Sequence, residues 1–489
     1  MAPTAADEKR VLSGVRTDLY LGGEWTPAAS GRTVVVEDPS TGETLAEVAD
    51  GSPDEALQAL GIAAEHQSGW AATAPRERGE ILRRTYELMV ARADDLALLM
   101  TLEMGKPIAE SKGEVTYAAE FLRWFSEEAV RVDGRFGIAP AGDSRLIVLK
   151  QPVGPCLFIT PWNFPLAMGT RKIGPAVAAG CTMVVKPAKQ TPLSMLALAG
   201  ILEEAGLPKG VLSVLTASSA GALTGPLLRD PRLRKLSFTG STEVGRQLVK
   251  DSADQLLRTS MELGGNAPFL VFEDADLDKA VDGAMLAKMR NMGEACTAAN
   301  RFHVHASVAE EFTRRLAERM GALTVARGTE DGAQVGPLID EAGRGKVEAL
   351  VADAVDRGAK PACGGARGDG RGYFFQPTVL SGVEPGSRIL REEVFGPVAP
   401  VATFESDDEA IAAANDTEFG LVSYAYTQSW DRGMKVIEAL ESGMLGLNRG
   451  LVSNPAAPFG GIKQSGFGRE GGPEGIEEYL DIKYVSTPH

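Results

Sequence analysis

The sequence predicts an α/β protein built around doubly wound, parallel β-sheets. Short apolar segments that are typical of buried strands alternate with helical segments across most of the 489 residues. Such alternation favours βαβ units, in which the strands run parallel and the helices cover the sheet. The chain also exceeds the size at which a single hydrophobic core keeps growing, so we expect two large domains.

The expected elements follow in a simple order. LYLGGEWTP, residues 19–27, predicts a hairpin that turns at Gly22 and Gly23. Apolar residues at three- and four-residue spacing predict helices over about 53–132, and 145–154 (RLIVLKQPVG) is typical of a strand. A first strand–helix series then ends at KLSFTG, and a second runs from SMELGGNAPFLVF to about residue 445. EEYLDIKYVST predicts one more strand.

Composition and charge narrow the classes of function. With 50 Lys and Arg against 66 Asp and Glu, the net charge of −16 would repel nucleic acids and anionic membranes. The 4 cysteines are too irregularly spaced for a disulfide framework or a metal motif. MAPTAADEKRVLSG has no apolar signal segment, and no stretch reaches the ~18 apolar residues of a membrane span. We expect a cytoplasmic protein with no metal and neither nucleic acid nor membrane as a partner.

One segment is typical of a phosphate site. FTGSTEVG places Gly240, Ser241 and Gly245 where a strand passes into a helix. Small residues there let backbone N–H groups and the positive end of a helix face an anion. Taken alone, the pattern fits an ordinary tight turn better.

Cys296, in RNMGEACTAANR, follows a predicted helix that begins at the N-cap Asp276 and ends at Gly293. The helix should bury Leu277, Val281, Met285 and Met292 on one face. A free cysteine is usually a small buried hydrophobe. The neighbours of Cys296 are small and loop-forming, however. Local composition therefore fits a structural thiol and a nucleophilic thiol equally well.

A nucleophilic thiol needs a general base nearby. The histidines are His66, His303, His305 and His489, and we expect His303 and His305 on a solvated strand face, where they form neither a metal site nor a base. Glu262 ends a predicted strand before two glycines, which suits a carboxylate that lines a cleft, although a solvated loop residue would look the same.

The motifs together resemble those of the aldehyde dehydrogenase superfamily. SMELGGNAPF and, 34 residues after its glutamate, GEACTAANR match the glutamate and cysteine motifs of that family. TPWNFP, VVKPAKQTP, FTGSTEVG, REEVFGPV and NDTEFGLVSYAYT agree in the same order, so the resemblance covers nearly the whole chain. Within the family, the chain is most similar to succinate-semialdehyde dehydrogenases. The resemblance implies a Rossmann-type cofactor domain, an α/β catalytic domain and a β oligomerisation extension.

The resemblance also implies a mechanism. Cys296 would attack the aldehyde, with the Asn163 side chain and the Cys296 N–H as oxyanion donors. Hydride transfer to a nicotinamide would leave a thioester, which water activated by Glu262 would hydrolyse. Arg171, Arg290 and Ser453 occupy positions where succinate-semialdehyde dehydrogenases bind the substrate carboxylate.

For the cofactor, the resemblance implies Trp162 and Lys186 beside the adenosine ribose and phosphates. Ser241, with Gly240 and Gly245, would meet the pyrophosphate, and Glu393 and Phe395 would contact the nicotinamide half. Considered without their motifs, Lys186 could be a surface lysine and Glu393 could be an ordinary loop acid.

Members of the family that prefer NAD often carry a glutamate where this chain has Lys189. A cation there favours the 2′-phosphate, so we expect NADP to be preferred and NAD to be tolerated. If Lys189 points to solvent, the enzyme would be less selective.

Two positions depart from the family pattern. Ala298 replaces a cysteine that often follows the nucleophile by two residues, so a disulfide with Cys296 should be missing. Glu294 replaces a common glutamine, and a nearby anion would raise the pKa of Cys296 if it faced the thiol.

By resemblance, residues 1–130 and 153–260 form the dinucleotide-binding domain, 261–465 the catalytic domain, and 131–152 with 466–489 the oligomerisation extension. We expect a homodimer or homotetramer, because exposed strand edges invite pairing with another subunit. The alternatives are a dehydrogenase for glutarate semialdehyde or for a neutral aliphatic or aromatic aldehyde, and a non-catalytic binding protein on the same fold.

Overall fold

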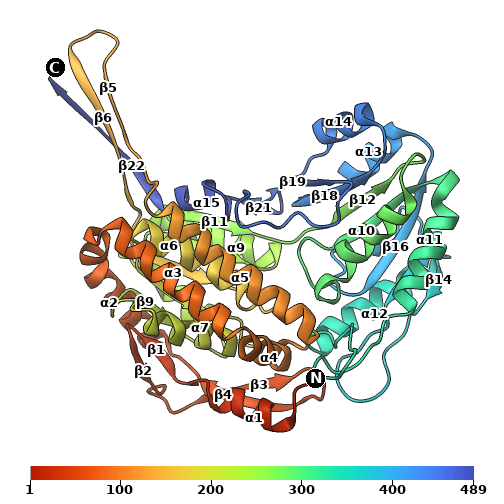
Figure 1. Cartoon of the computed structure of the whole chain (residues 1–489), viewed down its shortest axis with the longest axis horizontal. Helices are drawn as coiled ribbons and strands as arrows, with labels where there is room; N and C mark the ends of the chain where they lie inside the picture. The colour runs from red at the N-terminus through yellow and green to blue at the C-terminus, as the bar shows by residue number, and fades with distance from the viewer. Residues whose placement is uncertain (1, 489) are drawn as a thin grey trace.

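The computed structural model describes residues 2–488 and has two α/β lobes and a projecting β-arm (Figure 1). The first lobe contains an eight-stranded sheet in the order β2-β1-β9-β8-β7-β10-β11-β21. Its strands are β1 (Leu19–Leu21), β2 (Glu24–Thr26), β7 (Cys156–Ile159), β8 (Met183–Lys186), β9 (Leu212–Val214), β10 (Lys235–Thr239), β11 (Arg258–Glu262) and β21 (Gly466–Phe467). β9, β8, β7, β10 and β11 run parallel, so the predicted doubly wound class is confirmed.

Nine helices belong to this part of the described chain. They are α1 (Ala5–Ser13), α2 (Pro53–Ala72), α3 (Pro75–Ala91), α4 (Ala93–Met104), α5 (Ile108–Glu128), α6 (Ala167–Ala179), α7 (Leu193–Glu204), α8 (Ala220–Arg229) and α9 (Thr242–Ser252). The hairpin at Gly22 and Gly23 and the helices expected from residue 53 are present, and β3 (Thr33–Asp38) pairs with β4 (Glu43–Ala49). α5 packs against both α3 and α6 and buries Phe121 and Phe125.

The second lobe contains a seven-stranded sheet in the order β14-β15-β16-β13-β12-β18-β19, parallel except for β14. Its strands are β12 (Ala267–Val271), β13 (Ala299–His305), β14 (Lys360–Cys363), β15 (Thr378–Ser381), β16 (Val398–Phe404), β18 (Val422–Tyr426) and β19 (Met444–Leu447). Its helices are α10 (Leu277–Met289), α11 (Ala306–Gly321), α12 (Glu341–Asp356), α13 (Asp407–Asn415) and α14 (Trp430–Ala439). β17 (Phe419–Gly420) pairs with β20 (Ile462–Lys463), and the short helix α15 (Glu474–Glu477) returns to the first lobe, where it packs against α6.

The arm is a three-stranded antiparallel sheet that projects away from the first lobe (Figure 1). It consists of β5 (Arg135–Ile138), β6 (Ser144–Pro152) and β22 (Leu480–Pro488), with β6 in the middle. Leu480 pairs with Pro152 and Pro488 pairs with Ser144, so β22 follows β6 along its whole length. The two expected strands therefore form one element.

The strand order reverses at β7 and β10, which are adjacent in the first sheet. Loops that leave the carboxyl ends of strands at such a point diverge and leave a crevice between them. Residues 160–165 follow β7, residues 240–241 follow β10, and Glu262 ends β11. The sequence segments with candidate site residues are therefore brought to the same edge of the first sheet.

Candidate active site

Cys296 lies on the loop that joins α10 to β13. Asp276 caps α10 by accepting a hydrogen bond from the Lys279 N–H at 3.2 Å, as the sequence predicts. The helix ends at Met289, however, so the prediction that it continues to Gly293 was wrong.

A short turn, η2 (Arg290–Gly293), replaces the expected last turn of the helix. Within it, Asn291 and Met292 have left-handed φ angles of 53° and 58°. Met292 is buried with Met104 and Val335, away from the core that α10 covers, and its Sδ accepts a hydrogen bond from Gly336 N at 3.1 Å. This local packing ends the regular helix early and turns the chain toward Cys296.

A cavity of about 390 Å³ lies between the two lobes and gathers most of the expected site residues. Of those residues, its wall contains Trp162, Asn163, Gly240, Ser241, Glu262, Cys296, Glu393 and Phe395. Gly245, Lys186, Lys189, Arg171, Arg290 and Ser453 are not part of that wall.

Glu262 presents a buried carboxyl group to this cavity. It is 3% exposed, and neither carboxyl oxygen has a hydrogen-bond partner between residues 2 and 488. Burial, together with the charge of Glu470, raises the pKa of Glu262 well above its usual range. A polar group this deeply buried is normally paired, so the vacant oxygens mark a site that can hold a water or substrate atom.

Cys296 is half-buried at the same cavity. Burial raises the pKa of its thiol to about 12, and the charge of Arg171, followed by that of Arg290, opposes this rise. Thr297 and Ala298 follow Cys296 in the chain. The backbone N–H of Cys296 donates no hydrogen bond to any residue within 2–488. Both the thiol and this N–H are therefore free to interact with a bound molecule.

The Asn163 side chain is held in place beside the thiol loop. Its Nδ2 donates to Glu294 O at 3.0 Å, and its Oδ1 accepts from Phe164 N at 3.1 Å. An amide nitrogen carries two donor hydrogens, so one stays available to the cavity. Asn163 Nδ2 and the Cys296 N–H together can form an oxyanion pocket.

Glu294 is 1% exposed, and its Oε1 accepts a hydrogen bond from Ile339 N at 3.1 Å. Its Oε2 is buried and has no partner among the described residues. Burial raises the pKa of Glu294 well above its usual range. Burial therefore favours the neutral acid over the carboxylate.

Another part of the cavity wall is aromatic and acidic. Trp162 and Phe395 meet edge to face, with ring centroids 5.3 Å apart. Glu393 Oε1 accepts from Gly265 N at 3.2 Å, and burial raises the pKa of Glu393 to about 7. Phe395 has a left-handed φ of 54°, which a bulky residue adopts only where its surroundings impose it.

The residues expected at a phosphate occupy the start of α9. Ser241 is its N-cap, and the Ser241 hydroxyl accepts from Val244 N at 3.4 Å. A Cβ on Gly245 would lie 2.4 Å from Leu263 Cδ2, so any larger residue there would force the Leu263 side chain to move. Gly240 lines the cavity directly before this helix.

Lys186 ends β8 and is 6% exposed, whereas Lys189 is exposed. Burial, and then the charge of Lys189, lowers the pKa of Lys186 to about 8. Lys189 lines a second cavity of about 310 Å³, whose wall shares Ile339 and Asp340 with the first. The two cavities therefore adjoin, which gives room for an elongated ligand.

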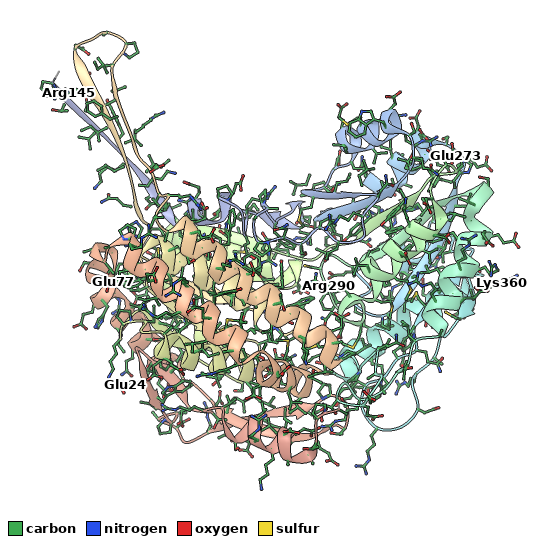
Figure 2. The ribbon with its side chains drawn as sticks, viewed as in Figure 1. Glu24, Glu77, Arg145, Glu273, Arg290 and Lys360 are labelled. Carbon is green, nitrogen blue, oxygen red and sulfur yellow. The ribbon has the colours of Figure 1, made fainter. Side chains whose placement is uncertain are left out.

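Arg290 and Ser453 come together across 163 residues of sequence, with Nη1 3.5 Å from the hydroxyl oxygen. The Arg290 guanidinium lies 4.9 Å from the centroid of the Phe164 ring. Figure 2 shows Arg290 between α5 and α10, whereas Arg145 and Lys360 are on the periphery.

Arg171 is engaged differently. It is 1% exposed, and its Nη2 lies 2.8 Å from Glu470 Oε2, without hydrogen-bond alignment, so the contact is an ion pair. Lys172 donates to the other oxygen of Glu470 at 2.5 Å. These two cations hold the pKa of Glu470 below its usual range in spite of burial.

Two lysines at the site were missed by the sequence analysis. Lys106, which is 1% exposed, donates to Asn163 O at 2.7 Å and to Glu114 Oε2 at 2.5 Å. Its position in the apolar stretch LLMTLEMGKP is a sequence signal for a buried, paired lysine. Lys346, on α12, lines the first cavity, and its charge opposes the burial-driven rise in the pKa of Glu393. No local sequence pattern points to it.

The prediction that His303 lies on a solvated face was wrong. It is 7% exposed, and burial lowers its pKa to about 3, so the imidazole is neutral. β13 is the fourth of seven strands and is covered on both faces, which hides alternate residues equally. His489 lies outside the described residues. Within 2–488, no three His, Cys, Asp or Glu residues are grouped to hold a metal ion, and no helix is both long and apolar enough to cross a membrane.

Comparison with known proteins gives consistent matches. The sequence profile of the aldehyde dehydrogenase family matches residues 25–485. The succinate-semialdehyde dehydrogenase of Paenarthrobacter nicotinovorans is 60% identical over 441 residues, which are 90% of this chain and 98% of the relative. The NADP(+) succinate-semialdehyde dehydrogenase of Escherichia coli is 50% identical, and a glutarate-semialdehyde dehydrogenase of Pseudomonas putida is 51% identical, each over 96% of this chain and 97% of the relative.

Solved structures agree with these matches. The succinate-semialdehyde dehydrogenase structure from Burkholderia pseudomallei superimposes with a TM-score of 0.96 at 51% identity. The match covers 98% of this chain and 99% of that one. The likeness therefore extends over both lobes and the arm.

Proposed function

The chain belongs to the aldehyde dehydrogenase family, and from that premise we propose that it oxidises succinate semialdehyde to succinate with NADP+, or less efficiently NAD+. The observation that carries this proposal is the pairing, in one cavity, of the Cys296 thiol with the unpartnered, buried carboxyl of Glu262. A nucleophile and a general base that face the same cavity are what a two-step acyl transfer requires.

In the first step, the Cys296 thiolate adds to the aldehyde carbon and the carbonyl oxygen becomes an alkoxide. Asn163 Nδ2 and the Cys296 N–H are free to donate to that oxygen, and removing such a donor typically costs ~10²–10³ in rate. The alkoxide then collapses to a thioester as hydride leaves the carbon.

In the second step, Glu262 removes a proton from a water that attacks the thioester carbonyl. The C–S bond breaks, the acid is released, and Cys296 returns as thiolate. Burial raises the pKa of Glu262, which makes its carboxylate a stronger proton acceptor.

The residues present fit a nicotinamide dinucleotide. Lys186 is a buried cation with no carboxylate partner between residues 2 and 488, which suits an anionic group, and Ser241 begins a helix at the same edge. Glu393 and Phe395 would hold the nicotinamide half, and the bound cofactor would accept the hydride. Lys189, at the adjoining cavity, supports a preference for NADP.

Arg290 with Ser453 would bind the distal carboxylate of the substrate, since a guanidinium forms paired, charge-assisted hydrogen bonds to a carboxylate. We retain Arg171 as a second contributor, although Glu470 already neutralises much of its charge. Glutarate semialdehyde is the second candidate substrate, because a relative named for it is 51% identical to this chain, close to the 50% of the Escherichia coli succinate-semialdehyde dehydrogenase.

We also propose that residues 1–130 and 153–260, which supply most of the eight-stranded sheet, bind the dinucleotide, that 261–465 carries the catalytic loop, and that 131–152 with 466–489 joins subunits. Exposed apolar residues on the arm, Phe136, Ile482 and Tyr484, support a homodimer or homotetramer. The four cysteines are free thiols, which supports a cytoplasmic location.

The test compares kcat/KM for succinate semialdehyde, glutarate semialdehyde and butanal with each nicotinamide cofactor. Cys296→Ala should abolish turnover, and Glu262→Gln should keep a first burst of reduced cofactor while steady turnover falls by ~10²–10⁴. Arg290→Met should raise KM for both semialdehydes and spare butanal. Equal steady turnover in Glu262→Gln would contradict the assignment of the base.

A further inference from the structure

One buried side-chain amide holds the left-handed turn that precedes Cys296. Asn291 is 0% exposed, and its Nδ2 donates to Asn163 O at 3.0 Å and to Glu294 O at 2.8 Å. Glu294 O also accepts from Asn163 Nδ2 at 3.0 Å. The Asn291 amide therefore bonds to both segments that carry the oxyanion donors, and those two segments are also bonded to each other.

The contacts fix the orientation of this amide. If it were flipped, its oxygen would face two carbonyl oxygens, so Nδ2 must point at Asn163 and Glu294. Asn291 Oδ1 is then left buried without a partner in the described chain, which destabilises the fold. Asn291 also tolerates its φ of 53° better than most residues would. The side chain is thus kept at a cost in stability, as is common at functional sites.

We propose that Asn291 is a positioning residue that sets the placement of the Asn163 amide relative to the Cys296 N–H in the oxyanion pocket. The inference rests on the proposed function. Without Asn291, the backbone of Asn163 keeps only the hydrogen bond from Lys106. The Glu294 carbonyl, two residues before the nucleophile, keeps only the one from Asn163. Each segment then loses one of its two hydrogen bonds, and only the direct bond from Asn163 Nδ2 to Glu294 O still links them.

Asn291→Gly removes both hydrogen bonds and keeps a residue suited to a left-handed φ. We expect the pre-steady-state burst of reduced cofactor to slow by at least about tenfold, short of the ~10²–10³ for outright loss of a donor. Alkylation of Cys296 by iodoacetamide, which forms no oxyanion, should change by less than about threefold. Asn163→Ala and the double variant should show the same burst rate, because Asn291 acts through Asn163.

Asn448→Gly is the matched control. Asn448 also has a left-handed φ, of 54°, and its amide donates to Thr427 O at 2.9 Å and accepts from Thr427 N at 3.0 Å. It should lower the melting temperature as Asn291→Gly does and leave the burst unchanged.

The proposal is overturned by an unchanged burst in Asn291→Gly, by an equal fall in alkylation, or by effects of Asn163→Ala and Asn291→Gly that multiply. It is also overturned if Asn448→Gly slows the burst equally. A parent enzyme without any burst on aldehydes would instead refute the proposed function.

Discussion

Burial acts in the same direction on the two reactive groups, Cys296 and Glu262. It favours the neutral thiol and the neutral acid, because a low-dielectric cavity penalises both anions. Arg171 and Arg290 partly offset that penalty at the thiol. We therefore expect the unliganded site to hold little thiolate near pH 7, so that the amount of thiolate limits its reactivity.

This balance gives a prediction for the unliganded protein. Since only thiolate is alkylated and the thiol pKa of about 12 lies above the working range, the iodoacetamide rate at Cys296 should rise by about tenfold per pH unit from about pH 7 to 9. Labelled peptides quantified by mass spectrometry give the rate, with Cys296→Ala as the blank. A plateau within this range would show that the pKa is ordinary or depressed.

The charge at Lys189 gives a prediction for the cofactor. Lys189→Glu should shift the NADP to NAD ratio of kcat/KM toward NAD by at least about tenfold, or ~1.4 kcal/mol, because a carboxylate would repel the 2′-phosphate. Lys360→Glu makes the same change of charge on the periphery (Figure 2) and should leave the ratio unchanged. A parent that prefers NAD, with no effect of Lys189→Glu, would make Lys189 a bystander.

Single residues could be recognised from sequence where a motif surrounds them. Glu262, Cys296 and Asn163 line one cavity as their motifs led us to expect. The ion pair of Arg171 with Glu470 could not be predicted, because nothing local to either residue indicates a partner so distant in sequence.

Elements were easier to predict than their ends. The hairpin, the helices from residue 53, the alternating strands and the N-cap of α10 all follow from local periodicity and capping. The end of α10 does not, because Met292 leaves the helix for a core supplied by other segments. The start of helix α6 is equally hard to predict from local sequence, because the residue that caps it lies on another helix. Glu114, on α5, accepts from Leu166 N at 3.0 Å and from Ala167 N at 3.1 Å.

The role of Glu114 as the cap of α6 gives a prediction for the stability of a Glu114 variant. The other carboxyl oxygen of Glu114 pairs with buried Lys106, so Glu114→Gln leaves a buried ammonium without a counter-charge. We expect the free energy of unfolding to fall by about 3–5 kcal/mol, as measured by urea titration. Glu24→Gln, which breaks the exposed pair with Lys209, should cost no more than about 1 kcal/mol. A loss of similar size in both variants would refute the structural role of Glu114.

At the scale of the whole molecule, the arm is the feature that a single chain leaves unexplained. Ile482 is 70% exposed and Tyr484 59%, and alternation along β22 puts them on the same face. Two apolar residues on a projecting sheet are typical of a subunit interface. Sequence alone showed the two strands but not that they pair along their full length.

If the arm joins subunits, charges on that face should separate them. The parent should be a dimer or tetramer by light scattering at micromolar concentration, and Ile482→Asp with Tyr484→Asp should yield a smaller species. Lys483→Asp, on the opposite face of the strand, is the control and should keep the assembly of the parent. A monomeric parent would end the proposal, and an intact assembly in the double variant would place the interface elsewhere.

The ion pairs of Glu470 join residues that are synthesised far apart in time. Lys172 precedes Glu470 by 298 residues, which a ribosome adding about 5–20 residues per second translates in roughly 15–60 s. During that interval, α6 carries two cations whose burial without a counter-ion would be strongly unfavourable. We therefore expect the nascent first lobe to stay incompletely packed at α6 until residues around 470 have been synthesised.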